Sequence, residues 1–125
     1  MDKELTEQKL KEITEKIVKE FQPEKIIFFG SWVWGNPGPD SDVDLLIIKD
    51  SQKPRLERKR ELYSLLFPPG VAMDILVYTP EELEESINVN RNLFIEDVVR
   101  NGKILYEKAG SMKSILPERE LVIVQ

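Results

Sequence analysis

The stretch from Phe28 to Ile48 constrains this chain more than any other part of it. It reads FFGSWVWGNPGPDSDVDLLII: an apolar strand, a Gly-Ser turn, a loop rich in glycine and proline, and a second strand that opens with two carboxylates. Side chains alternate between the faces of a strand, so Asp42 and Asp44 should project from the same side. Two carboxylates this close repel each other unless a cation lies between them. The pattern therefore predicts a metal site at the start of the second strand.

The bland alternative is that Asp42 caps a turn and Asp44 lies on a solvated strand face. The upstream Gly30-Ser31 favours the metal site, because backbone N–H groups and a hydroxyl that follow a strand can bind an anion such as a phosphate. Together with Gly35, this turn also fits the first half of a P-loop. However, Asn36-Pro37 stands where that motif requires lysine and Ser/Thr, so a P-loop is excluded.

A third carboxylate occurs in a later apolar run, which predicts a strand over Val71–Tyr78. Asp74 shares one face of that strand with Leu76 and Tyr78. An aspartate among such neighbours is costly to bury unless it is paired or bound to a metal, so Asp74 is a candidate functional residue. The alternative is that Asp74 lies at an exposed strand edge.

Taken together, these features resemble the nucleotidyltransferase superfamily that includes DNA polymerase beta. The chain looks most like its smallest members, the MNT type found beside HEPN-domain proteins in toxin–antitoxin pairs. The family signature is Gly followed by Gly or Ser, a short loop and D-x-D, with a third carboxylate on a later strand. Here these are Gly30-Ser31, Ser41-Asp42-Val43-Asp44-Leu45 and Asp74. One departure is that Trp32-Val33-Trp34 stands where small members often carry Arg-Ala-Arg.

The resemblance, which covers residues 13–106, implies that AMP is transferred from ATP to a hydroxyl acceptor and that pyrophosphate is released. Three carboxylates would be catalytic and would bind two Mg²⁺ or Mn²⁺ ions: Asp42, Asp44 and Asp74. Three residues would contact the nucleotide: Gly30, Ser31 and Ser41. The implied acceptor is a tyrosine of a HEPN-type toxin, with this chain as antitoxin. Two alternatives stay open: an antitoxin that acts by contact with an idle site, and an enzyme that adds nucleotides to an RNA end.

Composition narrows the cofactor and the partners. With 125 residues, the chain predicts one domain over residues 1–110 and a C-terminal tail over residues 111–125. The absence of cysteine and histidine excludes disulfides and disfavours zinc, whereas magnesium suits the carboxylates. A net charge of −5 argues against non-specific binding to long nucleic acid. No apolar run reaches membrane-spanning length and no secretory signal is visible, so we expect a cytoplasmic protein.

The remaining pattern predicts an α/β (α+β) fold, with a small mixed sheet, helices mainly on one face and the acidic cluster on the other. Strands are expected over Lys25–Phe29, Val43–Ile48, Val71–Tyr78 and Lys103–Tyr106, and helices over Glu4–Phe21, Pro54–Phe67, Pro80–Ser86 and Leu93–Val99. The loop 30–41 is expected to be irregular, and Gly102 to be a left-handed helix stop.

Three further segments carry weaker signals. Trp32 and Trp34 either stack on a base or cover the core, and we favour a core cover for at least one of them. The basic run over residues 53–60 indicates a solvated helix face or, alternatively, a patch that steers a triphosphate or an RNA end. The apolar end of the tail, residues 121–124, predicts a strand that associates with a partner or a second copy of the chain.

Overall fold

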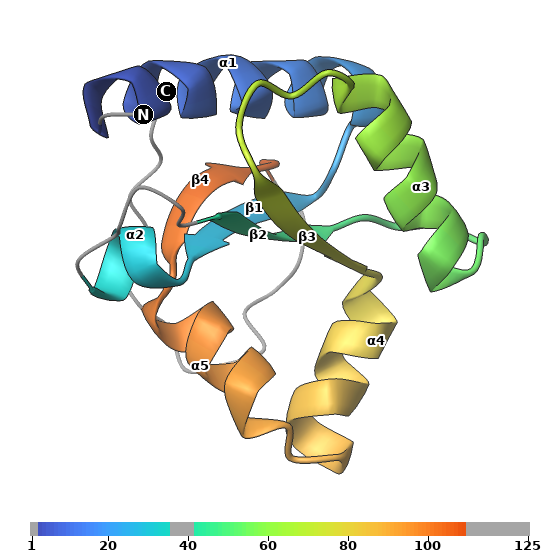
Figure 1. The fold of residues 1–125 in the computed structure, drawn as a ribbon. Helices are drawn as coiled ribbons and strands as arrows, with labels where there is room; N and C mark the ends of the chain where they lie inside the picture. The colour runs from blue at the N-terminus through green and yellow to red at the C-terminus, as the bar shows by residue number, and fades with distance from the viewer. Residues whose placement is uncertain (1–2, 36–41, 110–125) are drawn as a thin grey trace.

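The computed structural model describes residues 3–35 and 42–109, and Figure 1 shows a central sheet with helices on either side. The helices are α1 (Lys3–Phe21), α2 (Ser31–Trp34), α3 (Arg55–Leu66), α4 (Pro80–Glu84) and α5 (Leu93–Asn101), and the π-helical turn η1 (Glu85–Val89) extends α4. The strands are β1 (Lys25–Phe29), β2 (Val43–Ile48), β3 (Met73–Tyr78) and β4 (Lys103–Glu107). The tail 111–125 lies outside the described residues, so its role stays a prediction.

The four strands form one mixed sheet in the order β3-β2-β1-β4. β1 runs antiparallel to β2 and β4, whereas β2 and β3 are parallel. All four strands were expected from their apolar runs, and the α/β class with a mixed sheet is confirmed. Because α3 connects the two parallel strands, β2 and β3 begin at the same end of the sheet.

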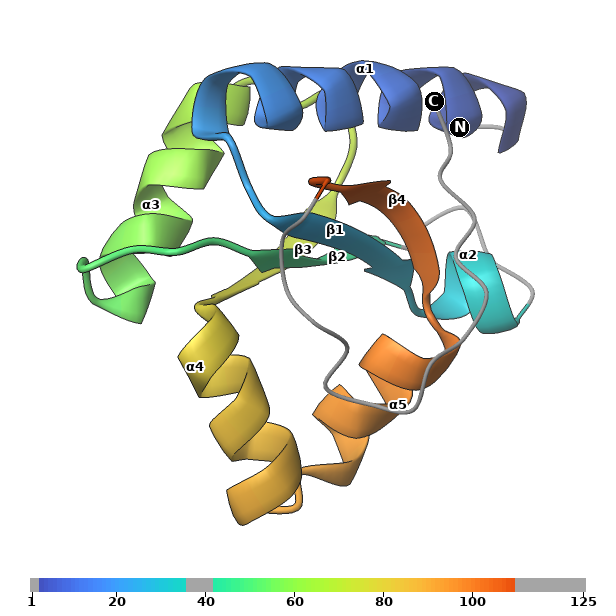
Figure 2. The same cartoon turned by 180° about the vertical axis from the view of Figure 1, so that it is seen from behind.

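Helices cover both faces of the sheet, whereas the sequence analysis placed them mainly on one (Figures 1 and 2). On one face, α1 and α3 pack in a core that includes Leu45 and Ile47 of β2. On the other face, α4, η1 and α5 pack in a core that includes Leu46 and Ile48. All four of these β2 side chains are buried, so both faces of the strand are apolar and need cover. Within the described ranges, no helix is long and apolar enough to cross a membrane.

The segment that follows β1 is more regular than expected. The loop 30–41 was predicted to lack regular structure, but its first residues form the short helix α2. Its turn is closed by the amides of Val33 and Trp34, which both donate to the carbonyl oxygen of Gly30 at 2.9 Å. Residues 36–41 lie outside the described part of the chain.

Gly102 was predicted to end a helix in the left-handed conformation, and this is wrong. It follows α5 with φ −71° and ψ 166°, which is ordinary extended backbone. A Cβ at this position would come within 3.2 Å of the Phe28 carbonyl oxygen and closer still to Val98. Glycine is required here because α5 approaches β1 closely, not because the backbone has a positive φ.

The basic run on α3 is neither a purely solvated face nor a free cationic patch. Arg58 is 1% exposed, and its guanidinium donates to both carboxylate oxygens of Glu82 at 2.9–3.0 Å. Glu82 also completes the predicted capping box of α4, since its carboxylate accepts from the Thr79 amide at 3.0 Å. Arg55 lies over the Tyr78 ring, 4.4 Å from its centroid. These contacts fix α3 against the start of α4.

We expect Glu82→Ala to lower the free energy of unfolding by about 3 kcal/mol, because it leaves the buried Arg58 charge without a partner. Glu84→Ala, on the exposed side of the same helix, is the matched control and should change stability by less than about 0.5 kcal/mol. Urea unfolding of both variants measures the difference. Equal losses in the two variants would show that the ion pair contributes little.

Candidate active site

The three predicted carboxylates lie at the same end of the sheet because of the pairing between β2 and β3. In this parallel pair, Asp44 lies opposite Asp74, and Asp42 precedes β2 by one residue. Asp44 and Asp74 have the same alternation as Leu46, so they lie on the face that α4, η1 and α5 cover further along the strands. The cluster therefore occupies the end of the sheet where β2 and β3 begin.

Burial differs among the three residues. Asp44 is half-buried, whereas Asp42 and Asp74 are exposed. Asp74 lies on an edge strand and reaches solvent, which is the alternative given for it above, so burial gives no reason for it to be paired or bound to a metal. Its position directly opposite Asp44 is a separate observation, and it places Asp74 in the same cluster.

The electrostatics of the cluster centre on Asp44. Burial, together with the smaller effects of the negative charges of Asp74 and Asp42, raises the pKa of its carboxyl from the usual 3.8 to about 6. Asp44 also lies against Gly30, whose φ of +89° favours glycine. A Cβ at Gly30 would come within 3.0 Å of the Asp44 carboxyl carbon and would overlap one of its oxygens. The Gly-Ser turn and the carboxylates thus form one site.

The other predicted nucleotide contacts are only partly described. Ser31 is exposed and begins α2, where the first amides of a helix have no acceptor within the helix. Ser41 lies outside the described residues, so its predicted role stays a prediction. The described part of the turn therefore brings Gly30, followed by Ser31, to the side of Asp44.

The donor atoms of the cluster suit a hard cation. All three side chains offer carboxylate oxygens, which are the ligands that Mg²⁺ and Mn²⁺ prefer. Among the described residues, no three acidic side chains converge closely enough to form a ready-made metal cage. Mutual repulsion acts against convergence, and after burial the charges of Asp74 and Asp42 are the further causes of the raised pKa of Asp44. The residues therefore fit a divalent cation whose charge would draw them together.

Comparison with known proteins identifies the family. The family model described as "Polymerase beta, Nucleotidyltransferase" matches residues 9–110. The chain belongs to this family. It is 26% identical over 98 residues to protein adenylyltransferase MntA of Aphanizomenon flos-aquae, an alignment that covers 78% of this chain and 65% of MntA. It is 31% identical over 103 residues to "Putative protein adenylyltransferase MJ0604" of Methanocaldococcus jannaschii, covering 74% of this chain and 97% of that protein.

This nucleotidyltransferase carries exposed aromatic side chains beside the cluster. Trp32 is half-buried and packs on the core beneath α1, as expected for a core cover. Trp34 is 43% exposed, with its indole N–H donating to the Asn101 carbonyl at 3.1 Å. Trp34 and Phe94 both contact Phe29, with ring centroids 6.2 and 5.8 Å apart. Of the two tryptophans, only Trp34 leaves open the alternative of stacking on a base.

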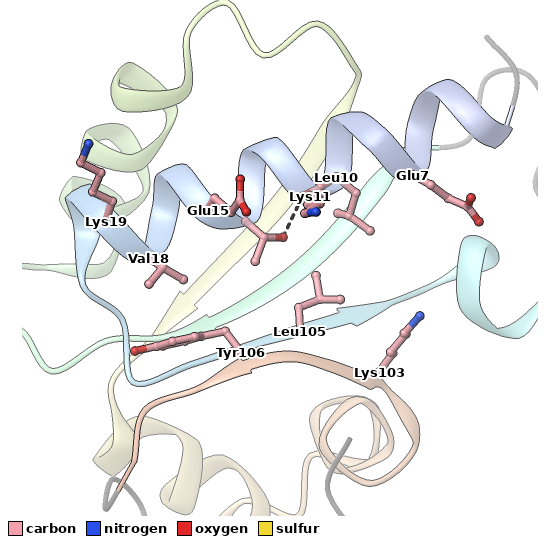
Figure 3. Close-up of a pocket in the computed structure, with 10 residues that line it drawn as sticks. Glu7, Leu10, Lys11, Glu15, Val18, Lys19, Lys103, Leu105 and Tyr106 are labelled. Atoms are coloured by element: carbon pink, nitrogen blue, oxygen red, sulfur yellow. Dashed lines mark hydrogen bonds between the residues drawn. The ribbon is translucent and has the colours of Figure 1, made fainter. Parts of the chain in front are cut away.

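A groove of about 550 Å³ lies elsewhere, between α1 and the edge strand β4. Figure 2 shows β4 between α1 and α5, and Figure 3 shows Leu10 of α1 pointing toward Leu105 of β4 and Val18 toward the Tyr106 ring. Charged side chains, among them Glu7 and Lys103, lie at its rim. None of the three aspartates lines it, and it lies on the α1 face. The groove is therefore separate from the carboxylate cluster.

One residue beside the cluster was not singled out from the sequence. Tyr63 of α3 donates its hydroxyl hydrogen to the Met73 carbonyl and accepts from the Ile75 amide, both at 3.1 Å. Burial raises the pKa of this phenol, and the charges of Asp74 and Asp42 add to that effect, although the Ile75 hydrogen bond lowers it. The hydroxyl therefore keeps its proton at neutral pH. A tyrosine within an apolar helical stripe is a signal, since its hydroxyl usually finds a partner.

We expect the stability of the folded chain to decrease as the pH rises from 3.8 to about 6 because of Asp44. In this window the folded carboxyl retains its proton and the unfolded one has lost it, so the folded state binds more protons and the free energy of unfolding falls with pH. Asp44→Asn removes this titration. The stability of the variant minus that of the wild type should therefore grow through the window and level off above it.

Urea unfolding in metal-free buffer at a series of pH values makes this measurement. Asp50→Asn, which alters an exposed carboxyl on the loop after β2, is the control and should follow the wild type. A difference between Asp44→Asn and the wild type that stays constant with pH would contradict the raised pKa.

Proposed function

We propose that this nucleotidyltransferase transfers AMP from ATP to a hydroxyl group of a partner protein, as a metal-dependent protein adenylyltransferase. The observation that carries the proposal is the position of Asp74 opposite Asp44, with Asp42 and the Gly30 turn at the same end of the sheet. The printed names of the two relatives support protein as the acceptor class and adenylyl as the group transferred.

In the proposed reaction, the acceptor oxygen attacks the α-phosphorus of ATP and forms a new P–O bond. The bond from the α-phosphorus to the β-phosphate oxygen breaks, and pyrophosphate leaves with the electron pair. Asp74 would favour deprotonation of the acceptor hydroxyl. Because Asp74 is exposed, the proton can pass to solvent there. Positioning and charge stabilisation supply most of what phosphoryl transfer requires of a protein.

Each residue of the site has a place in that scheme. Asp42, Asp44 and Asp74 would hold Mg²⁺, which when bound supplies positive charge to the phosphate oxygens. Gly30 leaves room for the Asp44 carboxyl, and the turn at Ser31 offers an amide and a hydroxyl to the β- and γ-phosphates. Asp44 is the least exposed of the three carboxylates, so burial opposes its ionised form most. A bound cation would therefore stabilise the charge of Asp44 most.

The proposed partner is a HEPN-type toxin with an acceptor tyrosine, as the MNT resemblance implies. The sheet and its five helices account for most of the described residues. The names of the two relatives support a hydroxyl group of another protein as the acceptor. ATP and such a toxin meet in the cytoplasm, which we keep as the proposed location. The contact-only antitoxin and the RNA-end enzyme remain as alternative outcomes of the tests below.

We expect Asp42→Asn, Asp44→Asn and Asp74→Asn each to abolish AMP transfer while leaving the melting temperature in metal-free buffer unchanged or raised, because each removes a mutually repelling charge.

Mg²⁺ with ATP should raise the melting temperature of the wild type more than either alone, since ligands that bind only the folded state stabilise it. Asp50→Asn is again the control and should retain transfer and the shift. Loss of folding in all three variants would make the aspartates structural.

We expect the wild type with ATP and magnesium to add one or more nucleotidyl groups to its cognate partner, seen as a mass increase by intact-protein mass spectrometry. Truncation after Gly110 should weaken the complex and leave ATP binding intact. A truncated protein that modifies its partner at full rate would remove the tail from the interface. A partner that is neutralised without gaining mass would favour the contact-only antitoxin, and labelling of RNA ends would favour the RNA enzyme.

A further inference from the structure

The edge strand β3 carries Asp74, and among residues 3–35 and 42–109 no strand pairs with the outer side of its backbone. Carbonyl oxygens at Ala72 and Tyr78 accept hydrogen bonds from amides of the β2 chain at 2.9 Å. Because the backbone groups of successive residues point to opposite sides of a strand, the even positions of β3 face β2. Met73 and Ile75, the two neighbours of Asp74, therefore turn their backbone groups outward.

A single hydroxyl forms a hydrogen bond with one outward backbone group of each of these two residues. Tyr63 of α3 donates to the Met73 carbonyl and accepts from the Ile75 amide, both at 3.1 Å. One donor and one acceptor on alternate residues are what a further strand would supply at this position. Helix α3 packs beside β3 (Figure 1) and partly buries the Tyr63 ring against the core, so the hydroxyl is held by a rigid element.

The position of Asp74 depends on this backbone. Its side chain is exposed, and among the described residues no donor forms a hydrogen bond with its carboxylate. Its placement opposite Asp44 is therefore set by the strand that carries it, with β2 on one side and Tyr63 on the other.

We propose that Tyr63 is a positioning residue for Asp74. The Tyr63 hydroxyl fixes β3 at Met73 and Ile75 and so holds the Asp74 carboxylate beside Asp44. The inference rests on the proposed function for its effect on turnover, but the clamp on the strand is independent of it. Tyr63 does not contact the substrate in this scheme. Its contribution is to the alignment of the site, which phosphoryl transfer requires to be accurate.

The test is Tyr63→Phe, which keeps the ring and removes the hydroxyl. Tyr106→Phe, the same change on the opposite edge strand β4, is the matched control. In Tyr63→Phe, the amides of both Ile75 and Asp74 should exchange with deuterium about tenfold faster, as expected from the loss of a hydrogen-bond pair at the edge. In Tyr106→Phe, both rates should match the wild type.

Turnover supplies the second readout. We expect kcat for AMP transfer to fall about tenfold in Tyr63→Phe, with KM for ATP changed by less than about twofold, because alignment and not nucleotide binding is impaired. A residue that only stabilises the fold would lower the melting temperature and leave kcat of the folded enzyme unchanged. Faster exchange with an unchanged kcat in an active enzyme would therefore overturn the positioning role.

The exchange data separate the two claims. If the wild type transfers no AMP, the proposed function fails. The exchange rates of the Ile75 and Asp74 amides then decide by themselves whether Tyr63 holds the strand. Acceleration at Ile75 and Asp74 then supports a hydroxyl that holds the strand at the carboxylate. Unchanged rates at both amides, or acceleration confined to Ile75, would overturn the inference whether or not the enzyme is active.

Discussion

Three carboxylates lie at one end of a small sheet, where burial and the charges of Asp74 and Asp42 both oppose the ionisation of Asp44. The parallel pairing of β2 with β3 puts Asp44 opposite Asp74, and strand alternation adds Asp42 from the preceding turn. The apolar strands that follow cannot relieve the repulsion, because both faces of β2 beyond Asp44 are buried. Burial of Asp44, and after it the charges of Asp74 and Asp42, raise the pKa of the Asp44 carboxyl. A cation bound between the carboxylates would reduce this repulsion and stabilise their ionised forms.

The surrounding elements hold that end of the sheet in place. α3 forms the crossover that makes β2 and β3 parallel, and its Tyr63 completes the outer edge of β3. The same helix is tied to the start of α4 by the buried pair of Arg58 and Glu82. On the other side, the glycine turn after β1 brings Gly30 against the Asp44 carboxyl. The site is thus built on strand ends and helix contacts, which position catalytic groups more accurately than loops do.

Local patterns in the sequence were sufficient for the strands, the capping box at Thr79 and the membership of Asp42, Asp44 and Asp74 in one cluster. They failed where tertiary contacts decide. Arg58 was read as part of a basic surface because its partner Glu82 lies 24 residues away, and Gly102 was read as a left-handed stop because the close approach of β1 is invisible in the sequence. The exposure of Asp74 and the second helical layer depend on strand order in the same way. The hydroxyl of Tyr63 becomes informative only once β3 is known to be an edge strand.

The metal site proposed above consists of the carboxylate cluster and the Gly30 turn, which would together bind a divalent cation with ATP. Paramagnetic broadening of the amide resonances by Mn²⁺, in the presence of a non-hydrolysable ATP analogue, is the direct test. We expect the broadening to centre on Asp42, Asp44, Asp74 and Gly30, and we expect Asp44→Asn to remove it. Broadening that centres on the acidic rim of the groove between α1 and β4, at Glu7 and Glu15, with the cluster unaffected, would rule out this metal site.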